Sequence, residues 1–256
     1  MSKKKGKGLY RLIFIAQLIS IIVIAIALYY IYIWYTDNKN TDKILENIYS
    51  KVDILSEDVN VDEIETSMLK LDFDNLISFN SDTIGWIRVW GTDINYPVVQ
   101  TNDNNFYLTH SFDKSYNKAG WIFADYTNSN LKNNQLDENT VIYGHNRQNR
   151  SMFGTLSNTL KKEWRDTEKN RYINFSTRDE SMVWEVFSTY TIDSENYYIK
   201  TSFSSEEEYE KFIKTIIDRS VYNFNVNVTT QDKILTLSSC TNIGEGRTVV
   251  HAKLMK

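Results

Sequence analysis

The chain has 256 residues, of which 41% are hydrophobic, and a formal net charge of −4 at pH 7. This composition allows one sizeable packed domain with an extension, and the single proline and nine glycines exclude collagen-like and low-complexity chains. Without the five basic residues that precede Leu12, 24 Lys and Arg stand against 33 Asp and Glu. We expect no nucleic-acid partner, because phosphate binding needs clustered basic charge.

A long apolar run occupies residues 12–35 and is interrupted only by Gln17 and Ser20. Its length fits one membrane-spanning helix, and it ends in aromatic residues typical of a membrane interface, whereas a cleaved signal peptide has a shorter apolar core. The basic residues before it are Lys3, Lys4, Lys5, Lys7 and Arg11. The positive-inside rule predicts that residues 1–11 are a cytoplasmic tail. We therefore expect a single-pass cell-membrane protein with an extracellular domain.

Residues 36–80 are predicted to form an N-terminal helical segment, because apolar side chains recur there at helical spacing. These side chains are Ile44, Leu45, Ile48, Ile64, Met68, Leu69 and Leu71. From residue 81 the pattern changes to short β-type runs, beginning with 84–90 and 94–99. Pro97, the only proline, indicates a sheet edge or a strand start at that point.

The rest of the chain alternates further strands with helical insertions. We expect a short turn or helix at 104–110, strands at 120–125, 141–146, 172–175 and 182–190, and helices at 153–164 and 204–219. The last helix has a Ser-Ser-Glu-Glu-Glu start, which is typical of an N-cap followed by an acidic first turn. The fold class is therefore mainly β with helical additions, and a barrel over residues 81–256 would close so many short strands.

The C-terminal stretch reads as two neighbouring strands, 234–237 and 248–254, joined by a loop. Cys240, the only cysteine, follows the first strand, and Arg247 precedes the second. If the strands pair, thiol and guanidinium approach one another, and a cation favours the nucleophilic thiolate. A lone cysteine is more often a small buried hydrophobe, but Cys240 follows Ser238 and Ser239 at a strand end, which favours an accessible position.

Three histidines are candidates for a Cys–His pair. His145 follows an apolar strand and precedes a polar loop, which would place its imidazole at a sheet edge. His251 lies within a strand and is expected to be a packed or surface residue, while His110 lies near a turn and is expected to be structural. No His or Cys pair has close ligand spacing, so we expect no metal site.

Two segments resemble a known family. Thr236-Leu237-Ser238-Ser239-Cys240 followed by Arg247 looks like the Thr-Leu-x-Thr-Cys…Arg signature of sortases, and Tyr143-Gly144-His145-Asn146 is similar to their catalytic histidine segment. The helical stretch before the first strand and the helix at 204–219 resemble class B sortases in particular. Ser239 replaces the usual Thr, and the loop from Cys240 to Arg247 is shorter than in several class B relatives.

The resemblance implies an eight-stranded sortase barrel and a cofactor-free cysteine transpeptidase. Cys240 would form a thioester after the Thr of an LPxTG-like sorting signal on surface proteins, His145 would be the general acid and base, and Arg247 would bind the oxyanion. The acceptor would be the amine of a peptidoglycan cross-bridge, a lipid-linked precursor or a pilin. By the same resemblance, the substrate groove would be lined by Asn104, Leu108, Tyr198, Ile199 and Ser238.

Two other classes remain open at this stage. A Cys–His hydrolase would use the same residues with water as acceptor, and only an assay with and without an added amine distinguishes the two activities. A non-catalytic, membrane-tethered binding module would need an inert Cys240.

Overall fold

The structure is a computed structural model that describes residues 3–51, 71–133, 135–193, 195–240 and 246–255. The chain divides into two compact units, residues 1–43 and 44–256. Helix α1 (Lys3–Tyr49) begins in the first unit and ends in the second. Among the described residues it contains the one helix long and apolar enough to cross a membrane, Gly8–Tyr49. The predicted helical positions Ile64, Met68 and Leu69 lie outside the described residues.

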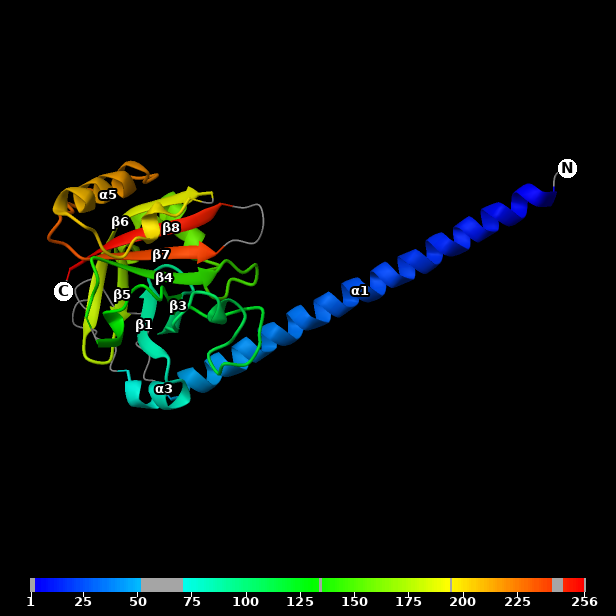
Figure 1. The fold of residues 1–256 in the computed structure, drawn as a ribbon, viewed down its shortest axis with the longest axis horizontal. Coiled ribbons are helices and arrows are strands. Elements are labelled where there is room, and N and C mark those ends of the chain that lie inside the picture. Colours follow the sequence, from blue (N-terminus) through cyan, green and yellow to red (C-terminus); the bar gives the residue numbers. More distant parts are fainter. Residues whose placement is uncertain (1–2, 52–70, 134, 194, 241–245, 256) are drawn as a thin grey trace. The chain divides into compact units, whose positions relative to one another are not determined.

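The second unit is built on eight strands that close into a barrel in the order β1-β2-β3-β4-β7-β8-β6-β5, which confirms the predicted fold class (Figure 1). The strands are β1 (Thr83–Val89), β2 (Asn95–Val99), β3 (Phe123–Ala124), β4 (Asn139–His145), β5 (Tyr172–Ser176), β6 (Ser181–Ile192), β7 (Ile234–Cys240) and β8 (Arg247–Leu254). Most neighbours are antiparallel, but β2 with β3 and β4 with β7 are parallel.

Alternation along the C-terminal strands separates two layers. Leu235 and Leu237 of β7 and Val250 of β8 belong to the main apolar core. The residues between them, such as Thr236 and Ser238, are buried too and form hydrogen bonds outside this core. Because both faces of these strands are covered, polar side chains on the second face must find partners within the protein.

Pro97 lies within β2, paired with Trp86 of β1, and not at a free sheet edge. On its other side β2 pairs with β3 only at Val99 and Phe123. The absent N–H of Pro97 therefore falls on a stretch that forms no ladder with β3, which is why a proline is tolerated inside this barrel.

Among the described residues that follow α1, the helical segments of the barrel unit are short apart from α5. They are α3 (Phe73–Phe79), α4 (Lys162–Asp166), α5 (Glu206–Asp218) and the 3-10 turns η1 (Phe106–Leu108), η2 (Leu131–Asn133), η3 (Leu156–Leu160), η4 (Glu168–Arg171) and η5 (Tyr197–Ile199). The predicted helix at 153–164 is divided into η3 and α4, because Lys161 between them has an extended backbone. The predicted strand at 120–125 is reduced to β3, since Gly120 has a left-handed backbone, with φ of 62°.

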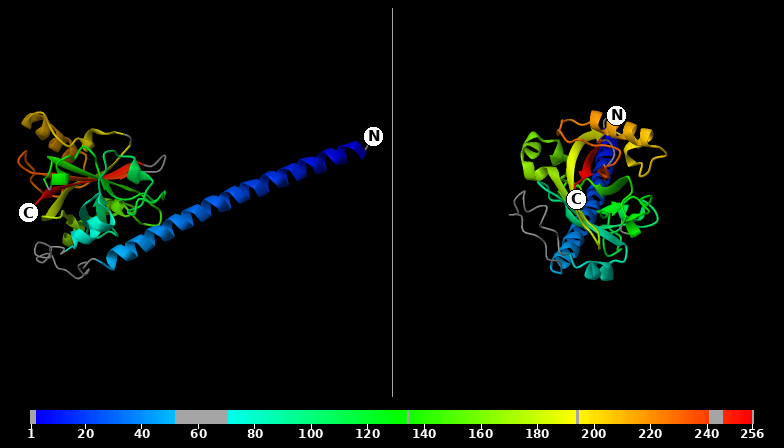
Figure 2. Two further views of the ribbon diagram at one scale, coloured as in Figure 1. Left: turned by 60° about the horizontal axis from the view of Figure 1, so that its bottom comes forward. Right: turned by 90° about the vertical axis from the view of Figure 1, so that its left-hand side faces the viewer.

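Helix α5 lies in the connection between β6 and β7, as predicted, and covers the outside of the barrel (Figure 2). Ser205 caps it by accepting a hydrogen bond from the backbone N–H of Glu208, and three acidic residues occupy its first turn. Its apolar stripe packs against Phe187 of β6 and Ile234 of β7; the stripe consists of Tyr209, Phe212, Ile213 and Ile216. The β6–β7 connection is thereby held over the second face of β7.

Candidate active site

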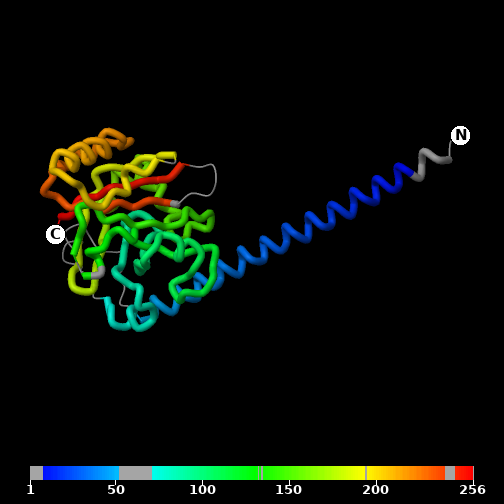
Figure 3. Tube along the Cα trace, viewed as in Figure 1, coloured from blue at the N-terminus to red at the C-terminus, as the bar shows by residue number. Residues whose placement is uncertain are grey.

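The parallel pairing of β4 with β7 brings two of the predicted residues together. The register runs in step from Asn139 opposite Ile234 to His145 opposite Cys240, at the carboxyl ends of both strands. In the chain trace, β4 and the C-terminal hairpin lie side by side (Figure 3). The backbones of His145 and Cys240, 95 positions apart in the sequence, are thus neighbours at one end of the barrel.

The antiparallel pairing of β7 with β8 brings Arg247 to the same end. The ladder includes Ser238 opposite Val249. One step further, the backbone N–H of Thr248 donates to Ser239 Oγ at 2.9 Å, which holds the two strands in the same register. Arg247, the first residue of β8, and Cys240, the last residue of β7, therefore lie at the same end of the hairpin. The Ser239 hydroxyl, which a threonine would also supply, therefore joins β7 to β8 at this position.

The imidazole of His145 is fixed by the loop that precedes β3. Its Nε2 lies 2.8 Å from the carbonyl oxygen of Leu108, and since a carbonyl only accepts, Nε2 carries the proton and donates. Burial lowers the pKa of His145, the Leu108 carbonyl opposes this effect, and the charge of Arg147 adds to it. The ring is therefore mainly neutral near pH 7 in the absence of substrate.

Gly120 allows this close approach. A Cβ at this position would lie 2.6 Å from the carbonyl oxygen of Tyr107 and 2.7 Å from His145 Cδ2. The left-handed backbone of Gly120 and the absence of a side chain are both needed for the loop to pass directly beside the imidazole. Sequence reasoning did not identify this residue; its position three residues before a strand was the only available signal.

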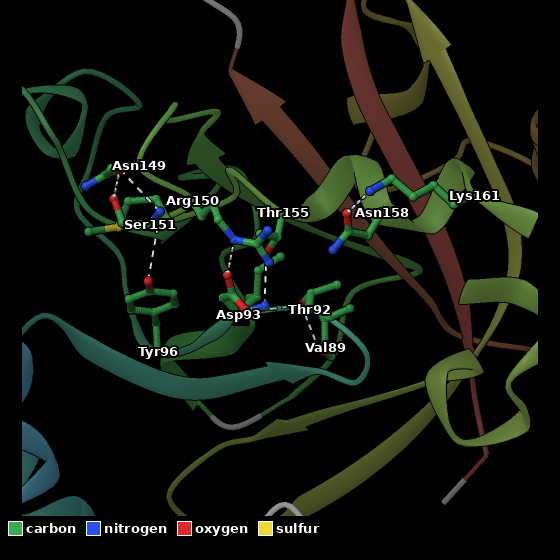
Figure 4. A network of polar contacts seen from close by, with 12 residues as sticks. Val89, Thr92, Asp93, Tyr96, Asn149, Arg150, Ser151, Thr155, Asn158 and Lys161 are labelled. Carbon is green, nitrogen blue, oxygen red and sulfur yellow. Dashed lines mark hydrogen bonds and ion pairs between the residues drawn. The ribbon is translucent and has the colours of Figure 1, made fainter. Parts of the chain in front are cut away.

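The polar loop that follows His145 is hydrogen-bonded to the turn between β1 and β2 (Figure 4). Arg150 Nε donates to Asp93 Oδ2 at 2.8 Å, and the backbone N–H of Asp93 donates to Thr155 Oγ1 at 3.0 Å. The loop also folds back on its own strand, where the N–H of Phe153 donates to the carbonyl oxygen of His145 at 3.0 Å. The backbone of His145 is thus held from both sides.

Arg247, Tyr198 and Ser238 form one hydrogen-bonded group. Arg247 Nη1 lies 3.2 Å from the hydroxyl of Tyr198, to which it donates, and the same hydroxyl lies 3.0 Å from Ser238 Oγ. Tyr198 and Ser238 are both fully buried. Ile199 follows Tyr198 in η5 and is half-buried against the core. Three of the predicted residues therefore meet through one phenolic oxygen.

Asn104 is held in place at both ends of its side-chain amide. Its Nδ2 donates to Asp125 Oδ2 at 3.0 Å, and its Oδ1 accepts from the backbone N–H of Tyr126 at 3.0 Å. The same Asp125 oxygen accepts from the hydroxyl of Tyr143 at 2.7 Å, two residues before His145. Asp125, which the sequence analysis did not single out, thus connects the Asn104 turn to the histidine strand.

The other two histidines lie in packed surroundings. His251 is fully buried, with Tyr190 and Thr236 as hydrogen-bond partners, and burial lowers its pKa to about 3. The ring of His110 stacks on Phe106 at 4.0 Å, and its Nδ1 lies 2.8 Å from the carbonyl oxygen of the same residue. In the described part of the chain, no group of three His, Cys, Asp or Glu side chains could hold a metal ion.

Comparison with known proteins identifies the class that this barrel and its C-terminal strands define. The Sortase domain family model matches residues 87–255, so the chain belongs to the sortase family and is a sortase-type cysteine transpeptidase. Within the family it belongs with sortase B. It is 33% identical over 249 residues to Sortase B of Staphylococcus aureus (strain NCTC 8325 / PS 47). The aligned region covers 96% of this chain and 98% of the relative.

Solved structures agree with this assignment. The crystal structure of a Bacillus anthracis protein described as similar to sortase B is 38% identical, covers 86% of this chain and 96% of its own, and superposes with a TM-score of 0.70. A sortase B complexed with triglycine is 30% identical, covers 87% of this chain and 98% of its own, and has a TM-score of 0.71.

Proposed function

We propose that Cys240 is the nucleophile, His145 the general acid and base, and Arg247 the oxyanion-binding group of this transpeptidase. The observation that carries the proposal is the strand pairing, which places His145 opposite Cys240 and joins β7 to β8, the strand that begins at Arg247, at the same end of the barrel. The three residues come from three adjacent strands of a closed barrel. Rigid strands keep reacting groups in the geometry that catalysis needs.

The proposed reaction has two steps. The Cys240 thiolate attacks the carbonyl carbon of Thr in an LPxTG-like sorting signal; the C–N bond breaks, and imidazolium His145 gives its proton to the departing amine. An acceptor amine then attacks the thioester, neutral His145 takes its proton, and the thiolate leaves. Arg247 stabilises the negative oxygen that develops in both steps. Because burial lowers the pKa of His145, the imidazolium form is scarce near pH 7 and turnover is expected to be slow.

The proposed groove walls have different physical characters. Leu108 and Ile199 are half-buried and would offer apolar surface to the peptide. Tyr198 and Ser238 are fully buried, so they would act from behind the groove through the hydroxyls that they place beside Arg247. Asn104 would act as a support for the Leu108 turn, since both ends of its amide already have partners within the protein. An extended peptide lying between Leu108 and Ile199 would pass the end of β4 and β7.

The proposed acceptor is the amine of a peptidoglycan cross-bridge, a lipid-linked precursor or a pilin. One of the solved sortase B structures is a complex with triglycine, a short peptide with a free amino group, and the same acceptor chemistry would suit this chain. We further propose the division 1–11 cytoplasmic tail, 12–35 membrane anchor, 36–80 helical segment and 81–256 catalytic barrel, with the barrel outside the cell. The apolar helix and the basic residues before it support this topology.

A peptide panel tests the proposal. The detergent-solubilised full chain is incubated with sorting-signal peptides that differ at each position, with and without triglycine, and the products are identified by mass. We expect cleavage after Thr and transfer to triglycine, and no product with Cys240→Ala. Cleavage that triglycine neither accelerates nor diverts would indicate a hydrolase, and an active Cys240→Ala variant would refute the assignment of the nucleophile.

A further inference from the structure

A chain of buried hydrogen bonds runs along the second face of the C-terminal strands, behind the candidate site. The hydroxyl of Tyr197 donates to the hydroxyl of Tyr190 at 2.9 Å. The Tyr190 hydroxyl in turn lies 2.9 Å from His251 Nε2. On the other side of the ring, His251 Nδ1 lies 2.8 Å from Thr236 Oγ1, which donates to Asn139 Oδ1 at 2.6 Å. His251, Thr236 and Asn139 are all fully buried, so none of them can exchange these partners for water.

The direction of each hydrogen bond follows from the Asn139 end. Its Nδ2 donates to the carbonyl oxygens of Tyr198 at 3.1 Å and Lys200 at 2.8 Å, which identifies Oδ1 as the acceptor. The single hydroxyl proton of Thr236 is used on that oxygen. His251 must therefore donate from Nδ1 to Thr236 and accept at Nε2 from Tyr190. The ring is fixed as the neutral Nδ1–H tautomer, and every member of the chain is satisfied.

Asn139 connects this chain to the proposed groove wall. Its side chain holds the carbonyls of Tyr198 and Lys200, which flank Ile199, and its backbone N–H donates to the carbonyl oxygen of Thr201 at 3.2 Å. The segment 197–201 belongs to no strand, so these contacts replace a sheet ladder. The orientation of the Asn139 amide therefore determines where Tyr198 and Ile199 lie. That orientation is fixed in turn by the hydrogen bond from Thr236, whose hydroxyl is directed by His251.

We propose that His251 and Thr236 are positioning residues for the transpeptidase reaction, which act through Asn139 to hold the segment 197–201 against the substrate. The inference rests on the proposed roles of Tyr198 and Ile199 in the groove. Neither His251 nor Thr236 contacts the substrate in this scheme. Their effect is on binding of the sorting peptide, and the reactivity of the nucleophile is left unchanged.

The substitution Thr236→Val tests this role because it removes one hydroxyl at nearly constant volume. It leaves Asn139 Oδ1 without its donor and the Nδ1–H of His251 without its acceptor. Both groups are buried and cannot turn to water, so the position of the segment that Asn139 holds is weakened. If about 1 kcal/mol appears in substrate binding, KM for the sorting peptide rises roughly fivefold while kcat changes less than about twofold. Thr236→Ser, which restores the hydroxyl, returns KM to the wild-type value.

Thr159→Val is the matched control. Thr159 Oγ1 lies 2.8 Å from Thr189 Oγ1, both residues are fully buried, and the pair lies outside the chain that ends at Asn139. The control therefore loses an equivalent buried hydroxyl contact and is expected to lose similar stability with KM unchanged. An equal KM in Thr236→Val and wild type, or an equal rise in both Val variants, would overturn the proposal.

Nitrogen NMR of the wild-type histidine rings provides a test that needs no folded variant. We expect His251 to show a protonated Nδ1 and an unprotonated Nε2, and the opposite tautomer would overturn the proposal. Failure here differs from failure of the proposed function. If Cys240→Ala keeps full activity, the catalytic assignment is wrong, whereas an inactive Cys240→Ala with an unchanged KM in Thr236→Val refutes only the positioning role.

Discussion

The substitution Gly120→Ala would disturb the histidine without touching it chemically. The added methyl group has three near neighbours: the carbonyl oxygen of Tyr107 at 2.6 Å, His145 Cδ2 at 2.7 Å and the carbonyl oxygen of Leu108 at 3.0 Å. Two of these are backbone atoms of a turn that is tied by its own hydrogen bonds, so they cannot move aside like the end of a flexible side chain. The imidazole is the remaining part that can shift.

Two effects lower the free energy of unfolding of Gly120→Ala. An alanine at φ of 62° is strained by about 1–2 kcal/mol, and overpacking against a fixed backbone typically adds about 1–3 kcal/mol. We therefore expect Gly120→Ala to lower the free energy of unfolding by roughly 2–5 kcal/mol. Displacement of His145 from Leu108 also removes the contact that orients its ring, and displacing this proposed general acid is expected to lower kcat/KM by about 100-fold.

The control is Gly91→Ala, in the turn between β1 and β2. Gly91 also has a left-handed backbone, with φ of 71°, but the three atoms nearest to its added methyl group would all belong to the side chain of Asn170. It therefore reproduces the backbone strain with no contact to the histidine. Unfolding by urea gives the stability of each variant, and peptide transfer to triglycine, normalised to folded protein, gives kcat/KM. Equal kcat/KM in Gly120→Ala and Gly91→Ala would refute the reasoning.

The remaining predictions concern the barrel end and the buried histidine. Tyr198→Phe removes the hydroxyl between Ser238 and Arg247, and we expect kcat/KM to fall about 5–10-fold, with little loss of stability in a thermal melt. Arg247→Lys keeps the charge but loses the planar guanidinium, and we expect kcat to fall about 100-fold at nearly constant KM; an unchanged kcat would exclude the oxyanion role. Burial lowers the pKa of His251 to about 3, so below pH 6.5 the unfolded chain binds a proton that the folded chain does not. This contribution to stability is complete above pH 6.5 and is lost as the pH falls towards 3, by about 2 kcal/mol at pH 5, and unfolding of His251→Gln between pH 7.5 and 5 should show a correspondingly smaller decline.

The strands and the C-terminal hairpin could be predicted because their signals are local. Apolar and β-branched runs broken by polar turns identified all eight strand positions, and the Ser-Ser-Glu-Glu-Glu start identified α5. The short helices were less predictable, because the extended backbone at Lys161 interrupts a pattern that otherwise has helical spacing. The positions of His145, Cys240 and Arg247 followed from family resemblance together with the expectation that strand ends meet.

The supporting contacts could not be predicted, because they depend on distant parts of the chain. Asp125 receives hydrogen bonds from Asn104 and Tyr143, and neither spacing nor composition distinguishes it from a surface aspartate in a turn. The role of Gly120 depends on how closely two loops approach, which only the folded arrangement reveals. His251 was expected to be packed or on the surface, and its partners Tyr190 and Thr236 come from two different strands.

The parallel contact between β4 and β7 also has a consequence for biogenesis. Parallel neighbours need a long crossover, so this ladder spans most of the barrel sequence and closes only after the last hairpin has been synthesised and docked. A nascent or truncated chain that lacks the final strands would therefore carry the histidine without its proposed partner.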